Sequence, residues 1–155
     1  MTSFLSTFVN KIDSKGRVSV PAPFRASLIT ESFQGIIAYP SLAEPAIEAF
    51  GLSMLEQLNR RVLDKNLEDG EFEKTLLGRP DSIVETIMAL AHELPFDGQG
   101  RVIMPTALID AAGLDSQVAF VGRGNRFQIW NPSKFDEKQN EAVAKIRENL
   151  RIGST

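Results

Sequence analysis

The chain has 155 residues, 43% of them hydrophobic and 24% charged, which is typical of one globular domain or of two small related ones. It contains no cysteine, which excludes disulfides, zinc–thiolate sites and thiol catalysis. The net charge of −3 argues against a nucleic-acid partner, but the acid is concentrated in one part of the chain. Residues 1–40 carry a net charge of +2 (four basic, two acidic), whereas residues 41–94 carry −6 (five basic, eleven acidic).

The first elements expected are two strands joined by a tight turn. Residues 7–12 and 17–20 contain the β-branched and aromatic residues that strands favour. Asp13 and Gly16 take the first and fourth positions of the turn between them, which are the preferences of a type I turn. The proline that follows ends the second strand because it lacks an N–H donor, and residues 23–28 are expected to form a short helix.

Two amphipathic helices are predicted in the acidic middle of the chain, with a charged loop over residues 64–74 between them. The apolar residues that mark these helices recur at helical spacing. They are Leu55, Leu58 and Val62 in the first helix and Ile83, Ile87, Leu90 and Leu94 in the second.

The second half repeats the element order of the first. Residues 106–112 are predicted to form a helix, with Gly113 at its C-terminal cap. Residues 118–121 and 127–130 flank a glycine-rich loop and predict a hairpin.

A long helix is expected at the C-terminus, capped by Ser133. Its apolar edge would consist of Val143, Ile146 and Leu150. With strands concentrated in the two halves and helices between and after them, the predicted fold class is α+β.

An internal repeat relates the two halves. Residues 13–21 align without gaps on residues 97–105, an offset of 84 positions, and five of the nine residues are identical. A weaker second match sets Tyr39-Pro40-Ser41 against Asn131-Pro132-Ser133 at an offset of 92, which predicts that the first half is shortened by eight residues.

Each copy of the repeat contains an Asp-x-x-Gly-Arg turn, and this turn is the candidate functional site. Asp13 and Asp97 can accept amide hydrogen bonds inside the turn, while Gly16 and Gly100 tolerate a positive φ, so these residues shape it. The residues available to a ligand are Lys15 and Arg17 in the first copy and Gln99 and Arg101 in the second. Arginine and lysine suit phosphates and guanine edges, and glutamine can pair with adenine.

A purely structural interpretation of the turn is equally simple. An Asp and an Arg four residues apart across a turn often pair only with each other. Repetition favours a functional role, because both copies keep the arginine although the turn itself needs only Asp and Gly.

Other combinations of residues indicate no catalytic, metal or cofactor site. His92 is the single histidine and has no nucleophile motif near it. The acidic residues from Asp64 to Asp69 miss the spacing of a calcium loop. Neither Gly98-x-Gly100 nor Gly122-x-Gly124 completes a dinucleotide-binding fingerprint. We therefore expect no enzyme activity, no metal, no cofactor and no small-molecule substrate.

These motifs resemble the MraZ family of bacterial transcriptional regulators. The run from Phe8 to Pro21, followed by Phe24-Arg25, is similar to the first motif of that family. Residues 97–105 and the segments Val121-Gly122 and Phe127–Trp130 are similar to its second half.

The resemblance implies two SpoVT-AbrB-type repeats packed as a pseudo-two-fold, swapped-hairpin β-barrel with outer helices. Residues 7–54 would form repeat 1 with its following helix, and residues 55–90 a helical acidic linker. Residues 91–134 would form repeat 2, and residues 135–155 the C-terminal helix.

The resemblance also implies a sequence-specific, homo-oligomeric ring that binds short direct repeats in double-stranded DNA upstream of division and cell-wall genes, usually as a repressor. Its DNA-binding residues would be Asp13, Lys15, Arg17, Asp97 and Arg101, with Gln99 at the position matching Lys15. The first turn is expected to supply more charge than the second. Several subunits on successive repeats would compensate for the few cations in each one.

Without a basic leader over Met1–Val9 or an apolar run long enough to span a membrane, the expected location is the cytoplasm, on the nucleoid. The alternative function is a ring-forming scaffold that uses the same arginine turns against a protein partner.

Overall fold

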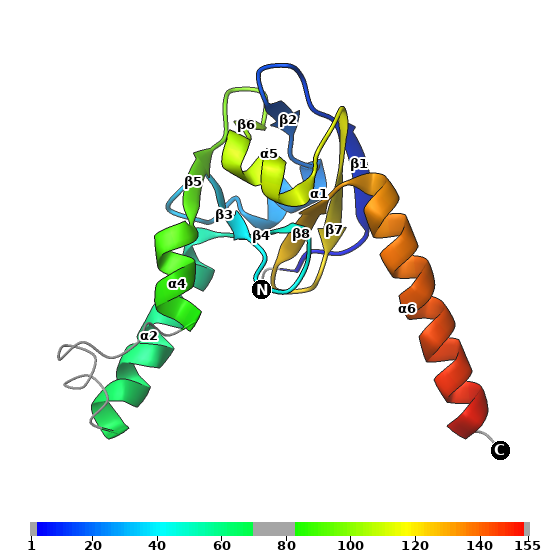
Figure 1. Cartoon of the computed structure of the whole chain (residues 1–155). Helices are drawn as coiled ribbons and strands as arrows, with labels where there is room; N and C mark the ends of the chain where they lie inside the picture. Colours follow the sequence, from blue (N-terminus) through cyan, green and yellow to red (C-terminus); the bar gives the residue numbers. More distant parts are fainter. Residues whose placement is uncertain (1–2, 70–82, 154–155) are drawn as a thin grey trace.

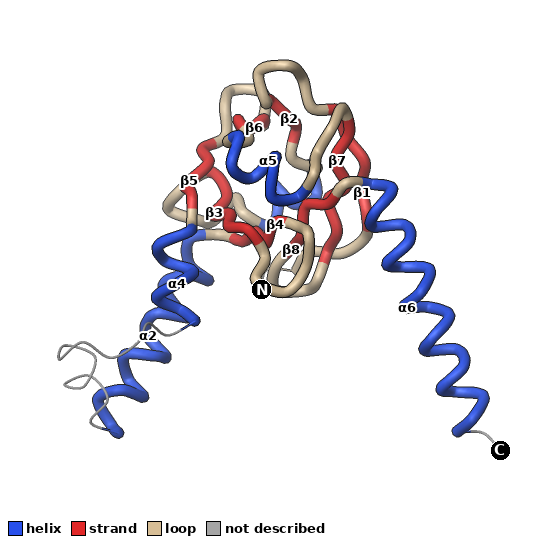
Figure 2. Tube along the Cα trace, in the orientation of Figure 1, coloured by secondary structure: helices blue, strands red, loops and turns tan. Residues whose placement is uncertain are grey.

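The computed structural model describes residues 3–69 and 83–153, which form an α+β fold with two antiparallel sheets (Figures 1 and 2). The larger sheet has six strands in the order β1-β7-β8-β4-β3-β5. Their bounds are β1 Thr7–Lys11, β3 Gly35–Pro40, β4 Ile47–Phe50, β5 His92–Pro95, β7 Gln117–Gly122 and β8 Phe127–Trp130. The smaller sheet pairs β2 (Arg17–Ser19) with β6 (Arg101–Ile103). The described helices are α1 Ala22–Ser27, α2 Leu52–Asp69, α4 Ile83–Leu90, α5 Thr106–Ala112 and α6 Pro132–Gly153.

The two halves of the chain exchange strands within these sheets. β1 of the first half pairs with β7 of the second, and β5 of the second half pairs with β3 of the first. The hairpins β3–β4 and β7–β8 meet at the centre, where β4 pairs with β8. The strand order is therefore symmetric. From one edge to the centre it is β1, β7 and β8, and from the other edge it is their counterparts β5, β3 and β4.

The small sheet also joins the halves, and it corrects the expectation of a local strand pair around the first turn. Val18 of β2 lies opposite Val102 of β6, and both are buried. By contrast, β1 and β2 are linked near the turn by a single bridge between Ile12 and Val18. The turn forms as expected, but its second strand finds its partner in the other half.

The largest of the three hydrophobic clusters among the described residues contains residues of both halves. Phe24 of α1 is buried and lies 4.9 Å from Phe127 of β8, 5.3 Å from Phe4 and 5.5 Å from Phe8, measured between ring centroids. The rings meet edge-on or tilted, as aromatic pairs prefer. Residues that are distant in the sequence thus contribute to the same core.

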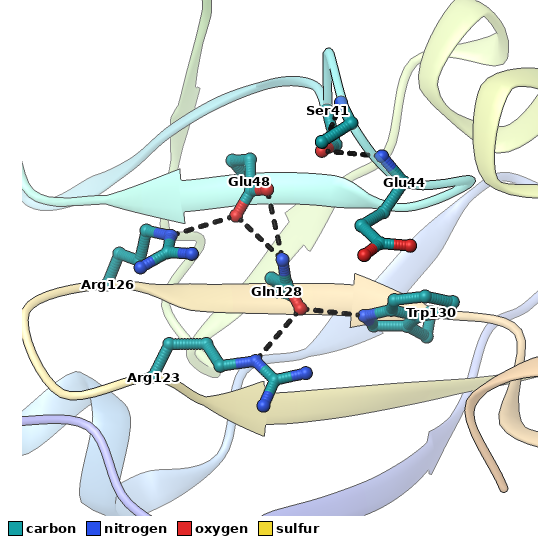
Figure 3. A network of polar contacts seen from close by, with 8 residues as sticks. Ser41, Glu44, Glu48, Arg123, Arg126, Gln128 and Trp130 are labelled. Atoms are coloured by element: carbon teal, nitrogen blue, oxygen red, sulfur yellow. Dashed lines mark hydrogen bonds and ion pairs between the residues drawn. The ribbon is translucent and has the colours of Figure 1, made fainter. Parts of the chain in front are cut away.

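The opposite face of the large sheet carries a buried polar pair at the junction of the two hairpins (Figure 3). Gln128 of β8 lies opposite Glu48 of β4, and its amide donates to both carboxylate oxygens at 3.0 Å. The Arg126 Nε also donates to Glu48, while the Arg123 Nε and the Trp130 indole N–H donate to the Gln128 carbonyl. Because both buried groups have partners, the pair avoids the desolvation penalty of an unsatisfied polar atom.

Helical arms project from two sides of the body and point away from the end that carries the turns between β1 and β2 and between β5 and β6 (Figure 1). One arm consists of α2 and α4, and the other of α6 alone. Three apolar side chains of α6, Ile146, Leu150 and Ile152, are more than half exposed.

Several sequence expectations are confirmed. Helix α5 occupies residues 106–112, and Gly113 caps it with a φ of 59°. The predicted hairpin is present as β7 and β8. The short helix after the first turn is α1.

Three expectations about the helices are wrong or incomplete. Leu94 does not continue a helix but lies buried in β5, where it adds to the core. Residues 64–69 belong to α2, while the rest of the predicted loop lies outside the described residues. Asn131, not Ser133, caps α6, because its Oδ1 accepts the N–H groups of residues 133 and 134.

The second repeat match is also wrong. Pro40 is the last residue of β3, and Ser41 begins the loop to β4, where its hydroxyl accepts two N–H groups. Neither residue starts a helix. Both halves contain a complete hairpin here, with β4 and β8 four residues long each, so the first half is not trimmed. The domain boundaries inferred from the resemblance stay a prediction.

Replacement of Phe24 by alanine should destabilise the whole fold, because the ring is fully enclosed by residues from both halves. We expect a loss of about 3–5 kcal/mol in the free energy of unfolding, measured by urea denaturation. Ile29→Ala, at a side chain that is 72% exposed, is the control and should change it by less than about 0.5 kcal/mol. Equal effects of the two substitutions would contradict the shared core.

Candidate nucleic-acid interface

Asp13 organises the first turn through both of its carboxylate oxygens. Oδ1 accepts the backbone N–H groups of Lys15 at 3.0 Å and Arg17 at 2.8 Å. Oδ2 accepts the Nε–H of the Arg17 side chain at 2.7 Å. One carboxylate therefore holds the turn closed and also orients the arginine.

The second turn has the same geometry. Asp97 Oδ1 accepts the N–H groups of Gln99 and Arg101, both at 2.9 Å. Its Oδ2 accepts the Nε–H of Arg101 at 2.8 Å. This match confirms the internal repeat at the level of individual hydrogen bonds.

Each turn needs its glycine for two reasons. Gly16 and Gly100 have φ values of 81° and 76°, a region that other residues rarely adopt. A Cβ atom on Gly16 would also lie 2.8 Å from the backbone oxygen of Met104 in the opposite strand. The glycines thus allow each turn to contact the other half closely.

Both arginines lie on one outward face of the β2–β6 ribbon. Val18 and Val102 point into the core, so their neighbours Arg17, Ser19 and Arg101 point away from it, as side chains alternate along a strand. Arg101 pairs with Ser19, two residues from Arg17, and such diagonal neighbours are about 7–8 Å apart. Ile103 lies opposite Arg17 on the same face and is 64% exposed.

The Asp–Arg ion pairs do not use up the guanidinium groups. Each arginine binds its aspartate through Nε. Within residues 3–69 and 83–153, the terminal amino groups of Arg17 and Arg101 have no further hydrogen-bond or ion-pair partner. The two side chains are 37% and 31% exposed. The pairing expected from the structural interpretation is present, and it leaves the guanidinium donors directed to solvent available for a ligand.

The other residues predicted for the site are exposed at the tips of the turns. Lys15 and Gln99 contribute their backbone N–H groups to the turns, while their side chains remain in solvent. The turns between β1 and β2 and between β5 and β6, which contain or border all six predicted residues, lie at the same end of the molecule (Figure 1).

Arg25 is a neighbour of the site that the motif did not predict as a ligand residue. It lies on α1, and its guanidinium packs against Gly100 of the second turn. In the sequence, Arg25 is marked only by its position shortly after the first motif. That position does not predict that its side chain contacts the second turn.

The hydrogen bonds within the turns lower the pKa values of their aspartates. The N–H of Arg17 and the N–H of Arg101 are the largest causes that lower the pKa values of Asp13 and Asp97, respectively, below the ordinary aspartate range. Both carboxylates are therefore fully charged at neutral pH and can hold their arginines.

Metal-ligating side chains do not cluster in the part of the chain that the structure describes. No group of three or more metal-ligating side chains occurs among these residues. His92 lies in β5 and belongs to no such group. None of the described helices is long and apolar enough to cross a membrane.

Comparison with known proteins identifies the family. A family model described as "MraZ protein, putative antitoxin-like" matches residues 87–150, which include the second turn. A transcriptional regulator MraZ of Rickettsia bellii is 46% identical over 141 residues, covering 88% of this chain and 87% of the relative. Those of Rickettsia africae and Rickettsia felis are each 43% identical, covering 98% and 92% of this chain and 96% and 90% of the relatives.

The chain belongs to the MraZ family. The resemblance drawn from its motifs is thus confirmed over nearly the whole length. MraZ proteins are transcriptional regulators and not enzymes, which agrees with the expectation of no catalytic site.

Gly16→Ala should strain the first turn, because alanine disfavours a φ of 81° and its Cβ would press on the Met104 carbonyl. We expect a loss of about 1–2 kcal/mol or more in the free energy of unfolding, measured by urea denaturation. Gly98→Ala is the matched control in the second turn, because no heavy atom lies within 4 Å of a Cβ placed there. A Gly16→Ala protein as stable as Gly98→Ala would contradict the described turn.

The lowered pKa values predict that the turns persist through mild acid. A folded-state pKa below the unfolded value means that the aspartates stabilise the turns fully above about pH 4 and lose this effect as the pH falls through the folded pKa. Carboxyl carbon shifts in NMR should place both titrations below those of the same aspartates in a peptide of residues 11–19 and a peptide of residues 95–103. Midpoints equal to those in the peptides would refute the carboxylate-centred turns.

Proposed function

We propose that this protein is a sequence-specific transcriptional regulator that contacts double-stranded DNA with the outward face of the β2–β6 ribbon and the two flanking turns. The observation that carries the proposal is that one short ribbon presents two aspartate-oriented arginines on one exposed face. A two-stranded ribbon fits the major groove, and guanidinium groups suit phosphates and the guanine edge there. Lys15 and Gln99 at the turn tips extend this surface on either side.

The fixed orientation of the arginines favours recognition of bases over simple charge attraction. A guanidinium held through Nε has lost much of its rotational freedom before DNA arrives. Less entropy is then lost on binding, and the remaining donors keep a defined direction. The role of Asp13 and Asp97 is to position the arginines, while Gly16 and Gly100 shape the turns.

The wider organisation proposed for the protein follows the family resemblance. The two sheets would close into a swapped-hairpin barrel, and several subunits would form a ring on short direct repeats upstream of division and cell-wall genes, acting as a cytoplasmic, nucleoid-bound repressor. The exposed apolar side chains of α6 support contacts between subunits, because they lie on an arm that projects from the body. The DNA-facing turns lie at the opposite end, so both contacts can form together.

Loss of the two arginines tests the proposed interface. The probe is the duplex that binds the wild-type protein most tightly in a selection from random-sequence DNA. Arg17→Ala and Arg101→Ala should each weaken binding roughly 5- to 150-fold, the range for removal of a bidentate hydrogen bond to a base. Each should also reduce the salt slope, by about 0.9 for every phosphate that the guanidinium neutralises. Arg147→Ala on α6, which removes the same charge from an exposed position, should leave both quantities unchanged.

Mass photometry of the same variants separates DNA contact from assembly. Wild-type affinity and slope in the Arg17→Ala/Arg101→Ala double variant would refute the interface. If that variant bound DNA normally but no longer assembled, the scaffold alternative would gain the support instead.

A further inference from the structure

The two turns differ in one residue that matters for charge, because Lys15 in the first is replaced by Gln99 in the second. A second difference lies outside the motif. The repeat offset of 84 places Ile109 of α5 at the position that Arg25 occupies in α1. The first half of the chain therefore has two cations, Lys15 and Arg25, that the second half lacks.

The exchange of strands brings Arg25 to the turn of the opposite half. Its Nε donates to the carbonyl oxygen of Val20 at 3.0 Å, and the N–H of Val20 donates to Gly100 at 3.1 Å. A Cβ on Gly100 would lie 2.6 Å from one terminal nitrogen of Arg25 and 2.7 Å from Cζ. The guanidinium therefore lies directly on the second turn, although α1 follows the first turn in the sequence.

Arg25 also borders an open pocket beside the second turn. Arg25 lines this pocket together with Phe96, Asp97, Gly98 and Gly100. Among residues 3–69 and 83–153, the guanidinium forms no hydrogen bond other than the one from Nε. The side chain is half-buried. The pattern repeats that of Arg17 and Arg101, where Nε is held by the protein and the end of the group is left to solvent.

We propose that Arg25 is a third arginine of the interface and binds a DNA phosphate next to the second turn, where it replaces the cation that Gln99 lacks. This inference rests on the proposed function and goes beyond it, since Arg25 lies outside the repeated turn. Each turn then has two cations: Lys15 and Arg17 at the first, Arg101 and Arg25 at the second. The expectation that the first turn supplies more charge is replaced by an equal division.

The two turns nevertheless present their second cation differently. Lys15 extends from the tip of its turn on a flexible side chain, whereas Arg25 is anchored on a strand carbonyl behind its turn. The interface is therefore balanced in charge but unequal in shape. A subunit of this kind has a direction on the duplex, which suits direct repeats better than palindromes.

A charge-swap experiment tests the replacement. With the selected duplex as the probe, Arg25→Gln should weaken binding and lower the salt slope by about 0.9, the value of one phosphate contact. Adding Gln99→Lys to Arg25→Gln should restore the slope, because it returns a cation to the same turn. Arg147→Gln on α6 is the control for net charge and should keep the wild-type slope.

A purely structural role for Arg25 predicts a different result. If Arg25 only stabilises the backbone at Val20, Arg25→Gln will weaken DNA binding without changing the salt slope, and adding Gln99→Lys will not restore the affinity. That result would overturn the proposal. If Arg17→Ala and Arg101→Ala reduce binding while Arg25→Gln does not, the proposed function stands and this inference fails.

The unaltered protein provides a second test in case Arg25→Gln does not fold. Phenylglyoxal modifies accessible guanidinium groups, and mass spectrometry of the peptides locates the modified residues. Arg25 should be modified in the free protein and protected by the selected duplex. Equal modification with and without DNA would overturn the proposal, and Arg147 should be modified equally in both samples.

Discussion

The pairing of β2 with β6 is the contact on which the rest of the structure depends. It sets Val18 against Val102 in the core and so turns Arg17 and Arg101 to the opposite, outward face. The same ladder continues to the glycines of both turns, through the Met104 N–H to Gly16 and the Val20 N–H to Gly100. Each turn is therefore held by a strand of the other half, and the candidate interface is complete only when both halves fold together.

A symmetric scaffold carries unequal chemistry at its equivalent positions. Because both halves lie in one chain, counterparts can differ, which two identical chains could not achieve. Glu48 and Gln128 illustrate this at the centre of the large sheet: two carboxylates would repel each other there, whereas glutamine donates to glutamate at 3.0 Å. Arg25 and Ile109 illustrate it at the proposed interface, where the exchange of strands places the single arginine beside the turn that lacks a lysine.

The fold also separates the turns from the helical arms in space. The turns lie at one end of the body, and the α2–α4 and α6 arms project from its sides and point away from that end (Figure 1). The turns are held by short hydrogen bonds and by glycines in close contact with the opposite strand, so their geometry does not depend on the arms. Under the proposed function, a subunit can therefore bind its neighbours through the arms while the ribbon keeps the geometry that reads DNA.

The sequence by itself determined the elements whose causes are local. The Asp-x-x-Gly-Arg turns, the cap at Gly113 and the β7–β8 hairpin follow from side-chain hydrogen bonding and backbone preference within a few residues. The tertiary structure decided which strands pair, that Leu94 belongs to the core, and that Arg25 reaches Gly100. Hydrophobic spacing is compatible with several partners and registers, and the choice among them is made by burial of a core shared between distant segments. A motif can thus be recognised from one stretch of chain, whereas its neighbours are known only after the two halves have exchanged strands.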